Sequence, residues 1–264
     1  MITAYHRPKT LDEALDLLAQ PNRTPLGGGT LLAQGRSDSV EAVDLQGLGL
    51  NTLKRSGNHL EIGATVTLQQ LLESEHELEP LGAALKLEAP LNLRNAATVA
   101  GTLVTCDGRS ALAAVLLASD AKLVMMRLTD SKIENLAISL GEFLPLRDRQ
   151  GALITSIAVP LNNKLAFEHL SRTPADKPMV CVAVAQWNSG RTRLVVGGYG
   201  KTPLLAMDGT ESDGASTPDT VLRAVETAVR NAFHEATDDW ASAEYRMDVA
   251  TTLASRCLAR LSVG

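Results

Sequence analysis

The residues of this chain with the clearest chemical potential form a glycine triplet near the N-terminus, in the run Pro25-Leu26-Gly27-Gly28-Gly29-Thr30. Three consecutive glycines remove every Cβ from a turn, so backbone N–H groups can converge on an anion. A helix beginning just after the triplet would add a favourable dipole, and Thr30 would add a hydroxyl. The run predicts a phosphate-binding loop, although a flexible turn between a strand and a helix would look the same.

A second run of small residues spans residues 94–102, with the sequence Arg-Asn-Ala-Ala-Thr-Val-Ala-Gly-Thr. Thr98 and Thr102 could offer hydroxyls to a ligand, and Ala100-Gly101 would let it approach the backbone. Alone this signal is weak, because a small-residue strand packed under a helix would share it. Neither run is a P-loop, which would end in Gly-Lys-Ser or Gly-Lys-Thr, and neither is a Gly-x-Gly-x-x-Gly dinucleotide fingerprint.

Composition excludes several other classes of function. Lys and Arg number 25 against 30 Asp and Glu, which gives a net charge of −5, and aromatic residues make up 3%. A nucleic-acid binder would show a basic footprint or aromatic platforms. The three cysteines are widely spaced and the five histidines scattered, so no metal site is predicted. With neither a signal-peptide pattern nor an apolar run long enough to span a membrane, we expect a cytoplasmic protein.

Local patterns predict a mixture of helices and strands in the first part of the chain. Thr10-x-x-Glu13 and Thr67-x-x-Gln70 are capping boxes that should open helices. The wholly apolar segment 110–119 predicts a buried helix, whereas residues 98–105 look extended around Gly101. A short strand is expected to end near Leu26, further strands are expected at 40–45, 59–64, 121–126 and 152–159, and a further helix at 81–89.

The pattern changes after Pro160. Three apolar segments are spaced like successive strands of an antiparallel sheet, at 164–170, 179–187 and 193–199. A polar loop at 208–216 and two helices, at 217–236 and 243–261, should follow. The predicted fold class is therefore α+β, with subdomains at residues 1–56 and 57–161 and a sheet-and-helices domain at 162–264.

The two loops, taken in this order, resemble those of a known family: the FAD-binding medium subunit of the xanthine dehydrogenase and carbon monoxide dehydrogenase group. Leu26 to Thr30 looks like that family's first flavin loop, and Leu93 to Leu103 looks like its second. The resemblance covers essentially the whole chain and includes four other segments: Tyr5-His6-Arg7-Pro8 with Leu11-Asp12-Glu13-Ala14, Leu60 to Thr67, Ala114 to Ala121, and Ser242 to Arg246.

The resemblance implies a two-subdomain FAD-binding fold of the molybdopterin dehydrogenase and vanillyl-alcohol-oxidase-like type. It also implies a molybdopterin-binding large subunit and a 2Fe-2S small subunit as partners, and NAD or another acceptor for the electrons. No side chain of this chain need act as a catalytic acid or base, because the cofactor carries the redox chemistry. The implied cofactor-binding residues are Leu26, Gly27, Gly28, Gly29, Thr30, Leu31, Thr98, Ala100, Gly101, Thr102 and Asp107.

Several of these positions depart from the family pattern. Leu31 and Ala111 stand where carboxylates are usual, Ala100 where glycine is usual and Thr102 where asparagine is usual. Asp107 could partly substitute for the carboxylates that are missing at positions 31 and 111. An alanine at 100 would cost about 1 kcal/mol if its φ had to be positive. Three hypotheses stay open: a chain that still binds FAD, a flavin-free assembly subunit of the same complex, and an unrelated nucleotide-binding module that uses the glycine triplet for another phosphate ligand.

Other polar and aromatic residues have a structural and a functional interpretation. Arg94 is expected to hydrogen-bond to backbone carbonyls near the second loop rather than to the cofactor. Trp187 and Tyr199 are expected in the core. Arg172 and Lys177 lie in a stretch that resembles a flavin-approaching segment of the family, but a plain solvated turn is the expectation we favour.

Overall fold

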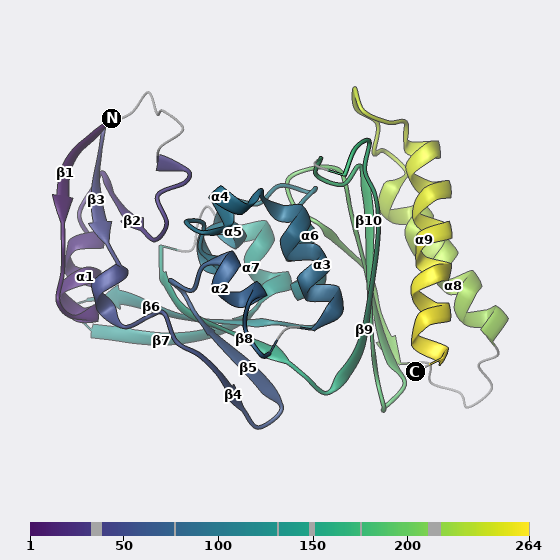
Figure 1. Cartoon of the computed structure of the whole chain (residues 1–264), viewed down its shortest axis with the longest axis horizontal. Coiled ribbons are helices and arrows are strands. Elements are labelled where there is room, and N and C mark those ends of the chain that lie inside the picture. Colours follow the sequence, from purple (N-terminus) through teal and green to yellow (C-terminus); the bar gives the residue numbers. More distant parts are fainter. Residues whose placement is uncertain are drawn as a thin grey trace. The chain divides into compact units, whose positions relative to one another are not determined.

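A computed structural model of the chain describes residues 1–32, 39–76, 78–130, 132–147, 151–174, 176–210 and 218–263. The chain forms two compact units and crosses between them more than once. Unit 1 contains Met1–Glu77, Leu91–Thr105 and Ala121–Val159, and unit 2 contains Leu78–Pro90, Cys106–Asp120 and Pro160–Gly264. Helices and strands occur in both units (Figure 1), which confirms the α+β class. The boundaries at residues 56/57 and 161/162 stay predictions.

The first sheet of unit 1 is parallel and leads directly into the glycine triplet. Its strands lie in the order β1 (Ile2–His6), β3 (Val40–Asp44), β2 (Arg23–Leu26). Helix α1 (Leu11–Leu18) connects β1 to β2, and the Thr10 side chain caps it by accepting a hydrogen bond from the Glu13 N–H. Strand β2 ends at Leu26, so the glycine triplet at residues 27–29 follows directly after the carboxyl end of this strand.

The second sheet of unit 1 has five strands in the order β4-β5-β8-β6-β7. Their bounds are β4 (Leu53–Ser56), β5 (His59–Gly63), β6 (Lys122–Thr129), β7 (Lys132–Ser139) and β8 (Leu153–Pro160). The helices of this unit are short: α2 (Leu68–Leu72), α4 (Leu91–Arg94), α5 (Val99–Thr105) and α7 (Leu140–Leu146). Thr67 and Ser139 open α2 and α7 with capping boxes, and the one predicted at Thr67 is confirmed.

The extended segment expected over residues 98–105 is wrong, because these residues form helix α5 after Thr98. Thr98 Oγ1 accepts a hydrogen bond from the Gly101 N–H at 3.1 Å, which is an N-cap. Val99 and Leu103 are fully buried, so packing outweighs the poor helix propensity of this Val-, Thr- and Gly-containing segment. Ala100 is therefore a helical residue without a positive φ, and the strain considered for it does not arise.

Unit 2 has an antiparallel sheet with helices on both faces. The strands lie in the order β12 (Leu204–Thr210), β11 (Arg191–Gly197), β10 (Val180–Trp187), β9 (Asn163–Leu170). Helices α3 (Glu79–Glu88) and α6 (Ala111–Ala118) pack on one face, and α8 (Pro218–Phe233) and α9 (Ala243–Val263) pack on the other (Figure 1). Residues 180–185 are buried on both faces, which explains their unbroken apolar run.

The predicted strands and the two long helices of unit 2 are confirmed within a few residues. The polar loop expected at 208–216 is wrong for residues 208–210, which complete strand β12, and its remainder lies outside the described residues. The sequence pattern of residues 208–210 does not indicate a strand, because these residues are held in β12 by long-range pairing with β11. The buried helix predicted at 110–119 is confirmed by α6, every residue of which is buried.

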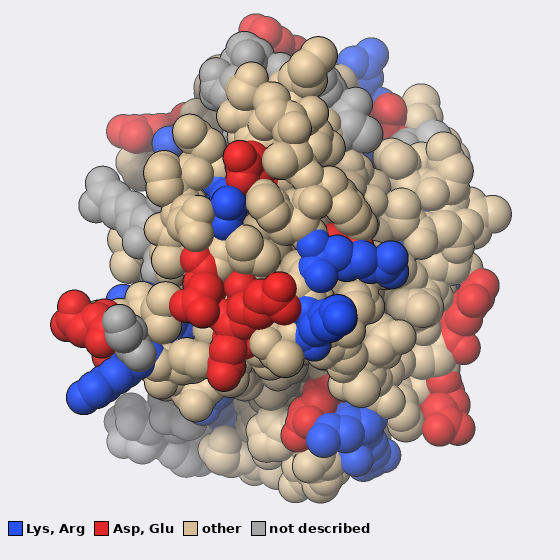
Figure 2. Space-filling view, turned by 90° about the vertical axis from the view of Figure 1, so that its left-hand side faces the viewer, with Lys and Arg blue, Asp and Glu red and all other residues tan. Residues whose placement is uncertain are grey.

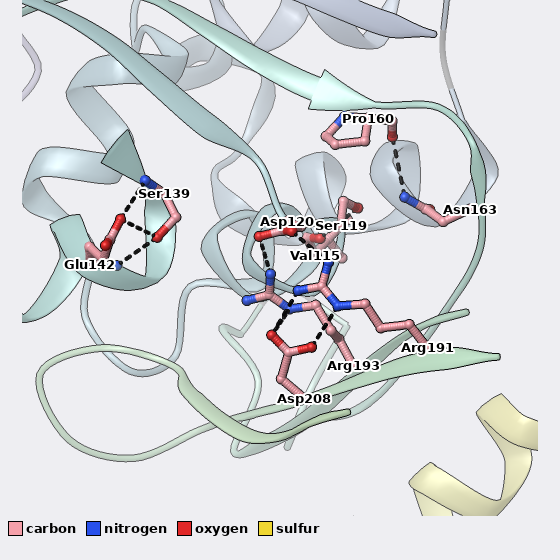
Figure 3. Close-up of polar contacts among 10 residues, drawn as sticks. All are labelled: Val115, Ser119, Asp120, Ser139, Glu142, Pro160, Asn163, Arg191, Arg193 and Asp208. Carbon is pink, nitrogen blue, oxygen red and sulfur yellow. Dashed lines mark hydrogen bonds and ion pairs between the residues drawn. The ribbon is translucent and has the colours of Figure 1, made fainter. Parts of the chain in front are cut away.

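Four charged side chains join the end of α6 to strands β11 and β12 (Figure 3). Asp120, which has a φ of 60°, accepts hydrogen bonds from Arg191 Nη1 at 2.9 Å and from Arg193 Nη1. Arg191 also holds Asp208 through Nε and Nη2, both at 2.8 Å. The side chain of Arg193 is only 3% exposed, so its charge depends on these carboxylates.

Replacing Asp120 with asparagine is expected to lower the free energy of unfolding by about 2 kcal/mol, because Arg193 loses its nearest charge partner. Asparagine tolerates the positive φ, so the change isolates the charge. Urea denaturation followed by circular dichroism measures the effect. Asp130→Asn is the matched control, since Asp130 also has a positive φ, of 47°, but is exposed. Equal loss in both variants would contradict a role for the ion network.

The face of the molecule shown in Figure 2 carries acidic and basic side chains close to one another, with a group of Asp and Glu side chains near its centre. Lys and Arg do not form a continuous stripe on this face, as they would along a nucleic-acid backbone. Among the described residues, no helix is long and apolar enough to cross a membrane.

Candidate functional site

A cavity of about 560 Å³ lies within unit 1, and residues of both predicted loops line it. Residues 26–31 all line it, and so do Thr98, Ala100, Gly101 and Thr102. Its volume falls in the range typical of cofactor and ligand pockets. Asp107, the remaining predicted residue, belongs to unit 2 and accepts a hydrogen bond from the Arg109 N–H, so its role toward a cofactor stays a prediction.

The two loops pack against each other through their glycines. A Cβ built on Gly28 would lie 1.7 Å from the Ala96 carbonyl oxygen, which no side chain can tolerate. A Cβ on Gly27 would lie 3.0 Å from Thr98 Oγ1, and Gly29 has a φ of 70°. Backbone contact between the loops therefore requires Gly28, and the turn itself requires Gly29.

Thr98 is the buried link between the loops. It is 3% exposed, and its Oγ1 accepts from the Gly101 N–H while lying against Gly27. The Thr102 hydroxyl donates to the Thr98 carbonyl at 2.9 Å, which leaves its oxygen free only to accept further bonds. Leu31 is 45% exposed and lines the cavity where the family usually has a carboxylate.

The cavity wall is basic. Arg23, at the start of β2, and Arg147, at the end of α7, both line it, and no Asp or Glu occurs among its described lining residues. Arg23 Nε donates to Glu41 Oε2 at 2.8 Å. Hydrogen bonds from His6 and Arg23 hold the pKa of the Glu41 carboxyl below its usual value, so Glu41 stays ionised and orients the guanidinium. This wall suits an anionic ligand such as a pyrophosphate.

Sequence reasoning missed both arginines. Arg23 had an available signal, since it begins the strand that ends in the glycine loop. Arg147 had none, because only folding brings α7 to the cavity. The cavity also has an apolar part, to which α1 contributes Leu15 and Leu18, and this was not predicted either.

The other residues weighed from sequence have structural partners. Arg94 Nε donates to Gln69 Oε1 at 2.9 Å, and the hydrogen bonds expected from Arg94 to backbone carbonyls stay a prediction. Tyr199 packs against the core of unit 2, as predicted, whereas Trp187 is only half-buried under Arg191.

Lys177 and Arg172 also have partners within unit 2. Lys177 Nζ lies 3.5 Å from Glu88 Oε1, and the Arg172 guanidinium carbon lies 5.4 Å from the centroid of the Trp240 ring. Any contact of Arg172 or Lys177 with a flavin therefore stays a prediction. No group of three or more His, Cys, Asp or Glu side chains in the described ranges could hold a metal ion.

The residues of the cavity fit an FAD molecule. The glycines bring two backbone segments together without side chains between them, the wall carries two guanidinium groups, and part of the lining is apolar. A dinucleotide needs these same features for its pyrophosphate and its rings. Ala100 stands where the family usually has glycine, and it adds no backbone strain because its backbone is helical.

Comparisons with known proteins identify the family of this chain. The family model for the FAD binding domain in molybdopterin dehydrogenase matches residues 1–162, and that for the CO dehydrogenase flavoprotein C-terminal domain matches residues 165–261. The chain is 26% identical over 267 residues to the glyceraldehyde dehydrogenase medium chain of Sulfolobus acidocaldarius, with 95% of each chain covered.

Two solved structures share the fold. Quinoline 2-oxidoreductase from Pseudomonas putida 86 superimposes with a TM-score of 0.81 at 20% identity, covering 99% of this chain and 97% of that one. Reconstituted CO dehydrogenase from Oligotropha carboxidovorans gives a TM-score of 0.80 at 23% identity, covering 98% and 97%. With both family models matched in chain order, this protein belongs to the FAD-binding flavoprotein family of the molybdopterin dehydrogenases, and it is an oxidoreductase subunit of that family.

Proposed function

We propose that this chain is the flavoprotein subunit of a molybdenum-containing hydroxylase or dehydrogenase. Its partners would be a molybdopterin-binding large subunit and a 2Fe-2S small subunit. The observation that carries the proposal is the cavity in which both glycine-containing loops meet beside Arg23 and Arg147. The relative from Sulfolobus acidocaldarius, a medium chain of a dehydrogenase, supports the multi-subunit setting.

The cofactor and the protein have separate tasks. When bound, FAD supplies the redox chemistry by which electrons from iron–sulfur clusters of a partner subunit reach NAD or another acceptor. The N–H groups of residues 27–29 bind anionic oxygens, and the two arginines offset negative charge. Thr98 holds the loops at a fixed separation. A cytoplasmic location also belongs to the proposal, because Cys106, Cys181 and Cys257 are free thiols of the kind a reducing compartment preserves.

The test is purification of this chain, with an affinity tag, from its own cells under mild conditions. We expect molybdenum, iron and FAD to co-purify with it, detected by metal analysis and the visible spectrum. Anaerobic NADH then reports the acceptor: bleaching of the flavin absorbance assigns NAD, and bleaching by dithionite alone assigns another acceptor. A chain that purifies without molybdenum and iron would contradict the proposed partners.

A flavin-free assembly subunit is the second candidate, and the absence of a carboxylate at Leu31, which lines the cavity, favours it. Ala111 is buried in helix α6 of unit 2 and is not among the residues that line the cavity. The double variant Leu31→Asp with Ala100→Gly separates the two. We expect the unmodified chain to bind FAD already, and the glycine in helix α5 to cost about 1 kcal/mol of stability. If only the double variant binds FAD in a fluorescence titration, the second candidate is correct.

A further inference from the structure

The glycine triplet begins at the point where the pairing of β2 with β3 ends. Leu26 lies opposite Asp44 in the register of the two strands, and the Leu45 N–H donates to the Leu26 carbonyl at 3.0 Å. The next carbonyl along the chain, that of Gly27, accepts a hydrogen bond from Gln46 Nε2 at 2.8 Å instead. A side chain therefore adds one more bond to this edge after the backbone pairing has stopped.

The position of Gln46 is set by Asp44, which is 3% exposed. Asp44 Oδ1 accepts from the Gln46 N–H at 2.9 Å, and this bond turns the chain directly after β3. Asp44 Oδ2 accepts from the Tyr5 hydroxyl and lies 3.7 Å from Arg7 Nε. Both oxygens of the buried carboxylate are therefore engaged, so the short 3-10 helix Gln46–Leu48 begins at a fixed place beside the end of β2.

Glycines on both sides of the peptide between Gly27 and Gly28 permit two opposite orientations of that peptide. Rotating it changes ψ of residue 27 and φ of residue 28, and neither residue has a Cβ that would resist the change. In a planar trans peptide the N–H points away from the C=O. One orientation therefore presents an N–H to the cavity, which attracts an anion, and the other presents a carbonyl oxygen, which repels it.

The orientation that Gln46 stabilises is the one that suits an anion. Gly27 and Gly28 line the cavity, whereas Gln46 does not. The Gly27 carbonyl therefore points to a group outside the cavity lining, and the Gly28 N–H points to the other side of the peptide. Within the described part of the chain, no backbone carbonyl accepts a hydrogen bond from the Gly28 or Gly29 N–H, so these residues leave both donors to a ligand.

Resting on the FAD-binding function proposed above, we propose that Gln46 is a positioning residue for the cofactor. Its hydrogen bond to the Gly27 carbonyl holds the glycine triplet, before FAD arrives, in the orientation that binds anionic oxygens. Asp44 is the buried anchor that keeps Gln46 in place. Without the Gln46 bond, a carbonyl oxygen faces the cavity in part of the molecules, and the apparent affinity falls with the fraction that stays competent.

The experiment compares Gln46→Met with the unmodified protein, both full-length and depleted of flavin, by stopped-flow fluorescence with FAD. Methionine is about as long as glutamine and donates no hydrogen bond. We expect the association rate constant for FAD to fall about fivefold and the dissociation rate constant to stay unchanged, because bound FAD holds the triplet by itself. Gln20→Met is the control, since Gln20 is exposed in the same unit and does not line the cavity. Its rate constants should equal those of the unmodified protein.

Restoring the donor separates positioning from a general structural role. Gln46→Lys again places an N–H donor within reach of the Gly27 carbonyl. Its association rate constant should return to within about twofold of the unmodified value, also in about 1 M salt, where charge effects are screened. Because Gln46 is exposed, neither variant should lower the thermal stability of the chain.

Three results would overturn the proposal: an unchanged association rate constant in Gln46→Met, a lysine variant as slow as the methionine variant, or a loss confined to the dissociation rate constant. An unmodified protein that binds no FAD contradicts the proposed function instead.

Discussion

Replacing Gly28 with alanine is expected to weaken FAD binding more than a hundredfold. The new Cβ would lie 1.7 Å from the carbonyl oxygen and 2.5 Å from the carbonyl carbon of Ala96, and both are backbone atoms that cannot rotate away. The two loops must then separate, at a cost of about 3 kcal/mol in overpacking strain and lost ligand contacts. Since the same contact places Thr98 beside Gly27, the change also disturbs the link that Thr98 makes between the loops.

Fluorescence titration of the flavin-depleted protein with FAD measures this effect. Gly47→Ala is the matched control, because a Cβ there would meet only the Pro8 carbonyl oxygen, at 3.9 Å, and Gly47 does not line the cavity. We expect the control to bind FAD as the unmodified chain does. Unchanged affinity in Gly28→Ala would show that close contact between residues 28 and 96 is not needed to hold the cofactor.

Replacing Arg246 with alanine is expected to destabilise unit 2 by about 4 kcal/mol. Arg246 is fully buried and donates to the carbonyls of Ala236 and Ala241 and to Asp238 Oδ1. Its guanidinium carbon also lies 5.2 Å from the centroid of the Tyr199 ring. The alanine variant would remove the side-chain donor of the Ala236 and Ala241 carbonyls and the charge partner of Asp238. It would also leave the space of a fully buried side chain empty, and these losses together make the effect large.

Chemical denaturation of the whole chain, followed by circular dichroism, checks this expectation. Arg256→Ala is the control, because Arg256 is exposed on the same helix α9 and should change stability by less than about 0.5 kcal/mol. Similar losses in the two variants would mean that the buried hydrogen bonds of Arg246 contribute little.

Acidification provides a second readout of the same contact. Burial by itself would raise the pKa of the Asp238 carboxyl, but hydrogen bonds from Arg246 and from the Trp240 and Ala241 N–H groups outweigh it and lower the pKa. A lowered pKa in the folded protein stabilises it above the unfolded pKa of about 3.9, and this contribution is lost as pH falls through the folded value. Arg246→Ala should therefore show a weaker loss of stability on acidification below about pH 4.

Local sequence signals predicted much of the fold because they act over a few residues. The box at Thr67 and the buried helix predicted at 110–119 were confirmed. Of the box predicted at Thr10 and Glu13, only the bond from the Glu13 N–H to the Thr10 hydroxyl forms, because Glu13 Oε2 accepts from the Lys9 N–H instead. Helix α5 and strand β12 were not predicted correctly, since burial of Val99 and pairing with β11 hold them in place. Such contacts cannot be read from propensity alone.

Some residues of the candidate site could likewise be predicted from the sequence, and others could not. The glycine triplet and residues 98–102 could be found from residue types and from the family resemblance. Arg23 and Arg147 reach the cavity only through the packing of β2 and α7. The departure at Ala100 was also a question of conformation: an alanine would be costly at positive φ, but within helix α5 it is the more favourable residue.

The most direct test of a cofactor held between these loops is the visible absorbance spectrum of the purified protein, together with its FAD content per chain. We expect a yellow protein with flavin bands that dithionite bleaches, and about one FAD released per chain on denaturation. A colourless protein that takes up no added FAD would contradict the assignment of this cavity to the flavin.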